Sequence, residues 1–212
     1  MALNIQCFSV TPFRQNCLLL WDDETRQAVL TDLGGDVDVV RAEVAKLGLS
    51  IGGIWLTHGH LDHVSGVPDW WQYENTPVLG PHQDDEFLFQ SLPETTAQYG
   101  WQYTPSFVPT RYLNEGDILN VGHYEFQVLH ISGHTPGHLV FYCASEHLLI
   151  AGDVLFFESI GRTDFPRGNH DDLLRNIRQK LYTLPEHTTV ISGHGRQTTI
   201  GHGKRYNPFV RA

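Results

Sequence analysis

Cysteine is scarce in this 212-residue chain, and its scarcity excludes a disulfide-stabilised fold. The three cysteines are Cys7, Cys17 and Cys143, an odd number that is too small for a disulfide framework. Cys143 lies in an apolar run that we predict to be a buried strand. We therefore expect free thiols and a cytoplasmic location, where thiols stay reduced.

Long apolar runs and runs of positive charge are also missing. No stretch reaches the ~18 apolar residues that a membrane helix needs, and the N-terminal residues lack the basic start and apolar centre of a signal peptide. Lys and Arg number 14 against 24 Asp and Glu, which gives a net charge of −10. Because nucleic-acid binding depends on neutralising phosphates, we expect neither a membrane nor a nucleic acid as a partner.

No linker, low-complexity segment or repeat divides the chain. Hydrophobic residues make up 41% of it, enough for a substantial core. We predict a single domain over residues 1–212. Oligomeric state is not predicted.

The segment Thr57–His63, T-H-G-H-L-D-H, is the most informative part of the chain because it places three imidazoles and one carboxylate within six residues. Neutral imidazole and carboxylate suit divalent ions such as zinc, iron or manganese. Side chains alternate along an extended backbone, so we expect His58, His60 and Asp62 to share one side and His63 to turn aside.

The flanking segments predict that this cluster lies in a loop between a strand and a helix. Ile51–Leu56, before it, is a short apolar run typical of a buried strand. Ser65–Tyr73, after it, has a pattern that favours a helix, in which Trp70 and Trp71 would pack in the core or in a lid.

Three later segments share one arrangement, in which an apolar strand is followed by glycine and a side chain that can bind metal. The strands are Gln127–Ile131, Leu148–Ala151 and Thr189–Ser192, and the side chains are His134, Asp153 and His194. The ends of neighbouring strands are where site residues converge from distant parts of a sequence. We therefore expect these three residues to join the histidine cluster.

With these motifs, the chain resembles the metallo-β-lactamase superfamily, and within it the glyoxalase II-like hydrolases, from about Phe8 to Pro208. The resemblance implies an α/β fold of the αββα type, with two mixed sheets face to face and helices on the outer faces. It also implies two divalent metal ions, of which zinc is the first candidate and iron or manganese the alternatives. One ion would be held by His58, His60 and His134 and the other by Asp62, His63 and His194, with Asp153 bridging them.

Our own interpretation of the remaining segments agrees with this order of elements. We predict a helix over Val37–Leu47, capped by Asp36 and ended by Gly48, and a second helix over Asp171–Leu181. Further strands are predicted at Leu3–Val10, Leu18–Trp21, Ala28–Thr31, Glu125–His130 and Val140–Cys143.

The implied chemistry is hydrolysis of an acyl compound, with Asp62 and Asp153 as the catalytic carboxylates. Metal coordination lowers the pKa of water to about 7, which supplies hydroxide at neutral pH. The chain contains no G-x-S-x-G motif that would indicate a serine nucleophile.

The resemblance also implies a small-molecule thioester substrate such as S-D-lactoylglutathione. Because 18 residues follow His194, we expect no C-terminal helical domain of the kind found in two-domain glyoxalase II enzymes. Single-domain bacterial relatives share the stretches 161–168 and 199–208, although they carry an acidic residue where Gly203 stands. We predict that the glutathione carboxylates are bound by four cationic side chains, Arg162, Arg167, Lys204 and Arg205.

Other functions compatible with the motif stay open. Persulfide dioxygenases of the same superfamily share the H-x-H-x-D-H cluster but bind a single iron. Gly193–Gly195 and the residues Pro166 and Arg167 after Phe165 favour the hydrolase. A lactonase or phosphodiesterase would use the same ligands. The non-enzymatic alternative is a binding module in which the metal ions only stabilise the fold.

Several residues outside the motif receive weaker predictions. His138 is predicted to be structural, with contact to a metal ligand as the alternative. Asp84 and Asp85 are predicted to be solvated surface charges. Gln90–Thr110, which is rich in aromatic residues, is predicted to be a loop near the mouth of the site.

Overall fold

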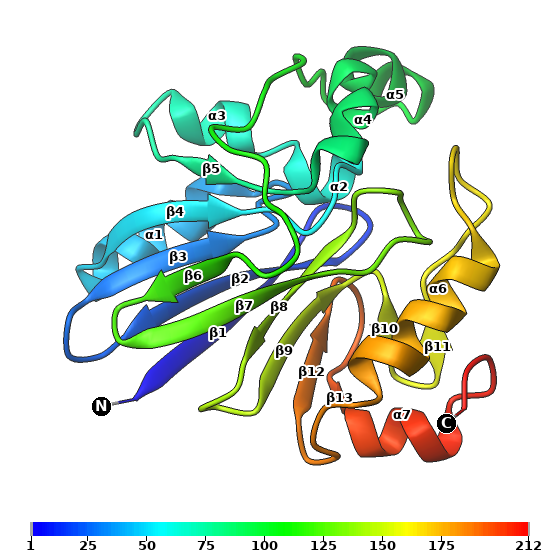
Figure 1. The fold of residues 1–212 in the computed structure, drawn as a ribbon. Helices are drawn as coiled ribbons and strands as arrows, with labels where there is room; N and C mark the ends of the chain where they lie inside the picture. Colours follow the sequence, from blue (N-terminus) through cyan, green and yellow to red (C-terminus); the bar gives the residue numbers. More distant parts are fainter. Residues whose placement is uncertain (1, 212) are drawn as a thin grey trace.

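The computed structural model describes residues 2–211, so the first and last residues of the predicted unit lie outside it. Its strands form two mixed sheets that lie face to face (Figure 1). The first sheet has the order β1-β2-β3-β4-β5 and is formed by Leu3–Val10, Gln15–Asp22, Gln27–Thr31, Ser50–Trp55 and Val78–Leu79. Its strands β1 to β3 are antiparallel, whereas β3 to β5 are parallel.

The second sheet has the order β13-β12-β9-β8-β7-β6. In that order its strands are Thr198–Thr199, Thr189–Ser192, Leu148–Gly152, Leu139–Cys143, Tyr124–His130 and Ile118–Val121. Only β12 and β9 pair in parallel among these strands. A small hairpin of β10 (Leu155–Phe156) and β11 (Ser159–Ile160) follows β9.

Helices cover the outer faces of both sheets (Figure 1). The helices of the first half are α1 (Val37–Leu47), α2 (Leu61–Val64), α3 (Val67–Trp71), the 3₁₀ turn η1 (Gln83–Asp85), α4 (Glu86–Gln90) and α5 (Leu92–Gln98). Those of the second half are α6 (His170–Asn176), its π-helical continuation η2 (Ile177–Leu181) and α7 (Ile200–Tyr206). The predicted αββα architecture is confirmed.

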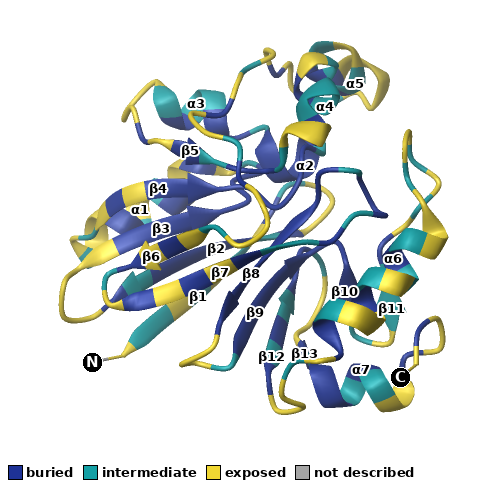
Figure 2. Cartoon of the chain, viewed as in Figure 1, coloured by how far each residue is buried: buried dark blue, intermediate teal, exposed yellow. Residues whose placement is uncertain are grey.

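Three hydrophobic clusters hold these layers together. One lies between the sheets and includes Trp55, whose ring meets that of Phe126 edge-on and that of Phe141 at a tilted angle. The other two lie between each sheet and its helices. Figure 2 accordingly shows buried strands in the interior and exposed residues on the outer helix surfaces. Trp70 belongs to the core, as predicted.

Helix α1 illustrates one correct prediction and one that is correct only in part. Val37, Val40 and Val44 give it a buried face, and Gly48 ends it with a φ of 62°, a left-handed conformation that glycine adopts without strain. Asp36 occupies the N-cap position, as predicted, but its side chain makes no capping hydrogen bond. The Asp36 side chain instead accepts a hydrogen bond from the Thr11 amide, 2.8 Å away, because the β1–β2 turn packs against this loop.

Other predicted boundaries need smaller corrections. The segment predicted as a helix over Asp171–Leu181 is α6 followed by η2, and the 65–73 helix is limited to α3. Gln90–Thr110 is not wholly a loop, because it contains α5. Cys7, Cys17 and Cys143 are free, as predicted. Within residues 2–211, no helix has the length and apolar character required to span a membrane.

Candidate metal centre

The histidine cluster follows β4 and runs directly into α2. His60 is still extended, with φ −71° and ψ 147°, and the helix begins at Leu61. The prediction that Asp62 shares one side with His58 and His60 along an extended backbone is therefore wrong. The helical turn separates the cluster into two pairs, so that Asp62 and His63 point toward a different group of side chains.

The first ligand set consists of His58, His60 and His134. His60 Nδ1 lies 3.1 Å from His58 Nε2 and 3.0 Å from His134 Nε2. The other nitrogen of His134, Nδ1, donates to the carbonyl oxygen of Arg162 at 2.7 Å. This hydrogen bond fixes the tautomer that leaves the His134 Nε2 lone pair facing its neighbours.

The second ligand set consists of Asp62, His63 and His194. Asp62 Oδ2 lies 3.2 Å from His194 Nε2 and 3.8 Å from His63 Nε2. His194 Nδ1 donates to the Phe13 carbonyl oxygen at 3.1 Å, which directs Nε2 toward Asp62. The predicted ligands from four separate segments are therefore close enough to form two groups that could each hold a metal ion.

Asp153 lies between the two sets. Its Oδ1 is 3.4 Å from His63 Nε2, and its Oδ2 is 3.6 Å from both His134 Nε2 and His194 Nε2. Asp153 Oδ1 and His63 Nε2 are buried and have no hydrogen-bond partner within residues 2–211. A Cβ atom at Gly193 would approach Asp153 Oδ1 to 2.2 Å, so glycine is required there. Unpartnered donor atoms converging in this way fit divalent cations.

The electrostatics of the first set favour neutral imidazoles. Burial is the main cause that lowers the pKa of His58, of His134 and of His60, the last to about 3. Burial also opposes the charged forms of His63 and Asp153, but the combined attraction of Asp153, Asp62 and Asp32 for His63, and of the surrounding imidazoles for Asp153, outweighs it. The pKa of His63 is therefore raised and that of Asp153 is lowered. Neutral nitrogens and ionised carboxylates are the forms that bind metal, so the pKa shifts of the first set and of Asp153 favour binding, whereas His63 must lose a proton when an ion binds.

Asp32, which the sequence analysis missed, orients ligands of both sets. Its carboxylate accepts from the Thr57 amide and hydroxyl and from His63 Nδ1, at 2.8 to 3.0 Å. Because the Thr57 hydroxyl proton points to Asp32, the Thr57 Oγ1 accepts from His58 Nδ1 at 3.0 Å. Asp32 thereby leaves Nε2 of both His58 and His63 free to bind a cation.

Replacing Asp32 by asparagine should weaken metal binding at the second set by roughly 10- to 100-fold, the usual effect of losing a partner that orients a ligand. The amide can still accept from Thr57, so the fold should persist. Titration of the metal-free protein with zinc against a competing chelator measures this affinity. An unchanged affinity would mean that Asp32 has no role in orienting His63.

Asp85 is buried, with 0% exposure, so the prediction of a solvated charge is wrong for this residue although Asp84 is exposed. Its carboxylate accepts from the Gly59 amide at 3.0 Å, the Thr135 hydroxyl at 2.8 Å and the Gly137 amide at 2.6 Å. Asp85 thus joins the loop that carries the first ligands to the turn that follows His134. Burial raises its pKa to about 6.

Replacing Asp85 by alanine should lower the free energy of unfolding by about 3 kcal/mol, because three buried donors lose their acceptor. Asp85→Asn should lower the free energy of unfolding by less than Asp85→Ala does, and it should change the pH dependence of that free energy. Since the pKa of Asp85 is about 6 in the folded protein and near 3.8 when unfolded, wild type gains stability from this group as the pH falls from 7 to 4. Urea unfolding of metal-free protein at both pH values should show no such gain in Asp85→Asn.

His138 contacts two candidate ligands, which supports the alternative that the sequence left open. Its ring stacks on that of His58 with centroids 4.7 Å apart, and its Nε2 accepts from the Asp153 amide at 3.0 Å. His138 has 0% exposure. It therefore fixes the backbone of Asp153 and the ring plane of His58.

Of the predicted substrate-binding residues, Arg162 lies beside the first set. Its carbonyl oxygen holds His134, and its guanidinium pairs with Asp164 at 2.7 Å and lies over the Phe165 ring. The Phe165 ring in turn lies 4.7 Å from that of His60. Cationic and aromatic groups therefore border the site on this side.

The other three predicted cations occupy different surroundings. The Arg167 guanidinium lies over the Phe87 ring, 4.2 Å from its centroid. Lys204 and Arg205 are on α7, where Arg205 pairs with Glu186. The structure therefore places only Arg162 in contact with a candidate metal ligand among these four.

Comparison with known proteins agrees with this site. A sequence model described as the metallo-beta-lactamase superfamily matches residues 10–194. The chain is 43% identical over 211 residues to hydroxyacylglutathione hydrolase GloC of Haemophilus influenzae, and the aligned region covers 99% of both sequences.

Two solved structures are also similar. The BLEG-1 B3 metallo-beta-lactamase has a TM-score of 0.90 and 34% identity, covering 99% of this chain and 100% of that one. The di-iron-bound form of TTHA1623 has a TM-score of 0.88 and 34% identity, covering 97% and 100%.

Proposed function

The chain belongs to the metallo-beta-lactamase superfamily, and on that premise we propose that it is a dinuclear metal hydrolase that cleaves a glutathione thioester such as S-D-lactoylglutathione. The observation that carries the proposal is the convergence of two ligand sets on the shared carboxylate of Asp153. The similarity to a protein named hydroxyacylglutathione hydrolase supports this class of substrate.

The first ligand set would hold one divalent ion and the second set the other, with Asp153 between them. Zinc is the first candidate, and the relative solved in a di-iron-bound form supports iron as an alternative. When bound, such ions lower the pKa of water to about 7 and polarise a carbonyl group. In the reaction, water adds to the thioester carbonyl carbon, the C–S bond breaks, and D-lactate and glutathione leave, the thiolate taking up a proton.

The residues of the chain would prepare this reaction by orientation and charge. Asp62 and Asp153 would offset the charge of bound cations. The orienting hydrogen bonds of His134, His194 and His63 keep their second ring nitrogens directed into the site. The Phe165 ring lies against that of His60 and borders the site on this side.

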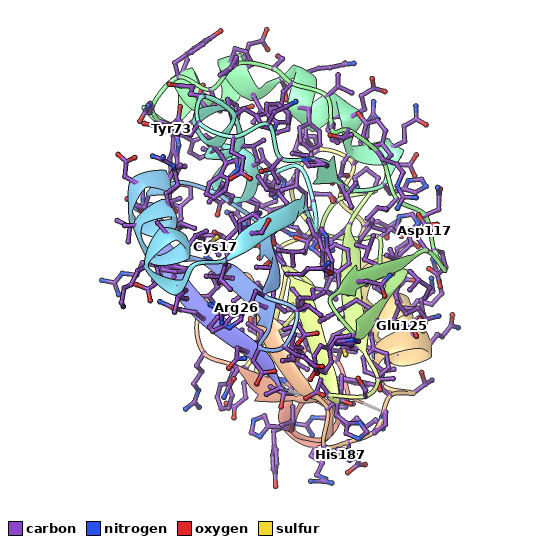
Figure 3. All side chains as sticks on the ribbon, turned by 90° about the vertical axis from the view of Figure 1, so that its left-hand side faces the viewer. Cys17, Arg26, Tyr73, Asp117, Glu125 and His187 are labelled. Carbon is purple, nitrogen blue, oxygen red and sulfur yellow. The ribbon has the colours of Figure 1, made fainter. Side chains whose placement is uncertain are left out.

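Replacing Arg162, Arg167, Lys204 and Arg205 together by alanine should raise the KM for S-D-lactoylglutathione at least about tenfold, since a hydrogen bond to a charged group contributes roughly 1.5–3 kcal/mol. Arg26→Ala is the control. Arg26 directly precedes β3, whereas Asp32 follows the other end of that strand, so Arg26 lies away from the candidate metal site (Figure 3). An unchanged KM in the fourfold variant would exclude these side chains from binding the thiol carrier.

A paired assay tests the proposed function. Metal-quantified protein is given S-D-lactoylglutathione and, separately, glutathione persulfide, each with and without oxygen. We expect thioester cleavage at the same rate in both atmospheres and no oxygen uptake with the persulfide. Oxygen uptake with the persulfide, without thioester cleavage, would instead identify a dioxygenase.

A further inference from the structure

A second group of side chains that can bind metal lies at the surface, outside the candidate metal centre. This outer cluster consists of His82, Asp84 and His130. His82 directly precedes the η1 turn, which contains Asp84, and His130 is the last residue of β7. Each of the three offers one ligand atom, and these atoms lie within 4.8 Å of one another. The fold therefore brings two imidazoles and a carboxylate together from separate segments.

The two imidazole rings of the outer cluster are held in place. They stack with their centroids 4.5 Å apart and their planes 17° apart. His130 Nε2 donates to the Pro136 carbonyl oxygen at 2.7 Å, so the lone pair of the neutral ring is on Nδ1. Backbone carbonyl oxygens orient His134 and His194 in the same manner. Such an orienting hydrogen bond is typical of histidines that bind metal.

The contact between His82 and Asp84 lacks a positive charge. Asp84 Oδ2 lies 3.2 Å from His82 Nδ1, but this nitrogen accepts a hydrogen bond from the Asp84 amide, also at 3.2 Å. A ring nitrogen that accepts a hydrogen bond has no proton to donate to a carboxylate. Two lone pairs therefore face each other. A cation in place of the long amide hydrogen bond would bind both atoms.

The spacing of the outer cluster suits zinc. Ligand atoms on a tetrahedral zinc ion lie about 3.3 Å apart, since each is about 2.0–2.1 Å from the metal. His82 Nδ1 and Asp84 Oδ2 already have this separation. The imidazoles are partly buried, whereas 57% of the Asp84 side chain is exposed, so the carboxylate is free to turn toward His130. Water would complete the coordination from the solvent side.

The surrounding charges permit a cation here. Lys180 is the cation beside His130, and its Nζ donates to Glu115 Oε2 at 2.7 Å and to the His130 carbonyl oxygen at 2.8 Å. Glu115 therefore neutralises the charge of Lys180. Burial lowers the pKa of His130, and the neighbouring His82 and Lys180 lower it further. The ring is thus neutral at pH 7, which is the form that binds metal.

The outer cluster also contacts the turn that follows the ligand His134. His130 donates to the Pro136 carbonyl oxygen, and the His82 amide donates to the Gly137 carbonyl oxygen at 3.1 Å. An ion bound by His82, Asp84 and His130 would therefore link η1 and β7 to each other, and both of them to this turn.

From these contacts we propose that the outer cluster is a third divalent-cation site, which takes zinc and stabilises the turn after His134. This site is separate from the two central ligand sets and does not depend on the proposed hydrolysis. It has three ligands at the surface and no bridging carboxylate, so it should bind zinc more weakly than the central sets. Protein reconstituted with two equivalents of zinc should therefore leave it empty.

Equilibrium dialysis against increasing zinc, followed by elemental analysis, tests this proposal. Wild type should bind a third ion in excess zinc, whereas His82→Ala and Asp84→Asn should saturate at two. Asp84→Asn removes the charge of an exposed side chain and keeps its shape, so the fold should persist. Saturation of wild type at two ions, or a third ion in both variants, would overturn the assignment.

His187→Ala is the matched control for the loss of a surface histidine. His187 is exposed, and its ring lies 4.1 Å from that of His147, centroid to centroid (Figure 3). Within the described residues, this pair belongs to no group of three potential ligands. His187→Ala should therefore bind a third ion as wild type does. Loss of that ion in His187→Ala would place it outside the outer cluster.

Thermal unfolding in excess zinc tests the stabilising role. An ion present at ten times its Kd raises the Tm of a chain of this size by about 4 °C. On going from two equivalents to excess zinc, the Tm of wild type should rise by about this much more than that of Asp84→Asn. Equal rises would contradict the proposal. Protein that binds three ions but cleaves no thioester would keep the outer site and reject the proposed function alone.

Discussion

Replacing Asp153 by alanine is expected to abolish thioester hydrolysis and to lower the metal content from two ions per chain toward one or none. Asp153 is the carboxylate whose oxygens approach His63 on one side and His134 and His194 on the other. Loss of a residue that only orients a metal ligand lowers metal affinity or activity by roughly 10- to 100-fold. Removing the shared carboxylate should therefore cost more than about 100-fold in kcat/KM.

The measurement combines steady-state kinetics with elemental analysis of the same preparation. Glu125→Ala serves as the control, because it removes an exposed carboxylate from β7 (Figure 3). Its activity and metal content should match those of wild type. Full hydrolytic activity in Asp153→Ala would contradict the bridging role.

Metal removal is expected to have the second large effect, on activity and on stability together. Without cations, the unpartnered atoms Asp153 Oδ1 and His63 Nε2 remain buried. A ligand present at a thousand times its Kd adds about 4 kcal/mol to the stability of the folded state. For a chain of this size, that corresponds to a Tm lower by about 10 °C after chelation.

Differential scanning calorimetry before and after dialysis against a chelator measures this change. Added zinc should restore both Tm and hydrolysis. In Asp153→Ala, chelation should change the Tm much less, because fewer ions are bound at the start. Chelated wild type that kept its activity would rule out metal-dependent hydrolysis.

The resemblance of the motifs to a known family predicted the fold, and the sequence indicated the seven candidate ligands for a local reason. Each ligand follows an apolar strand or stands in one dense motif, so its position is encoded by neighbours in the chain. Asp32 departs from this pattern, because it comes directly after β3 with no glycine before it, and Leu33 separates it from the two glycines that follow. Its place at the end of an apolar strand is the signal that could have indicated Asp32.

Asp85 and Asp36 could not be predicted in this way, because their roles depend on contacts with distant segments. Asp84 and Asp85 are identical neighbours in the sequence, yet one is exposed and the other is enclosed by Gly59, Thr135 and Gly137. No feature of the neighbouring sequence distinguishes Asp84 from Asp85. Similarly, the Asp36 side chain makes no capping hydrogen bond because it accepts one from the Thr11 amide in the β1–β2 turn.

A cavity lined by Phe13 and Trp101 combines both situations. The sequence predicted that Gln90–Thr110, which is rich in aromatic residues, forms a loop near the mouth of the site, and residues Tyr99–Thr104 line a cavity together with the β1–β2 turn. Phe13, however, enters this cavity from the β1–β2 turn, far away in the chain. Only the packing of the two segments brings Phe13 and Trp101 together.

The central claim is that two ions are held on either side of Asp153, and anomalous X-ray diffraction from crystals of zinc-reconstituted protein tests it most directly. We predict two zinc peaks, one contacted by His58, His60 and His134 and the other by Asp62, His63 and His194. A single peak or none at saturating zinc, with His194 turned away from Asp62, would contradict the account.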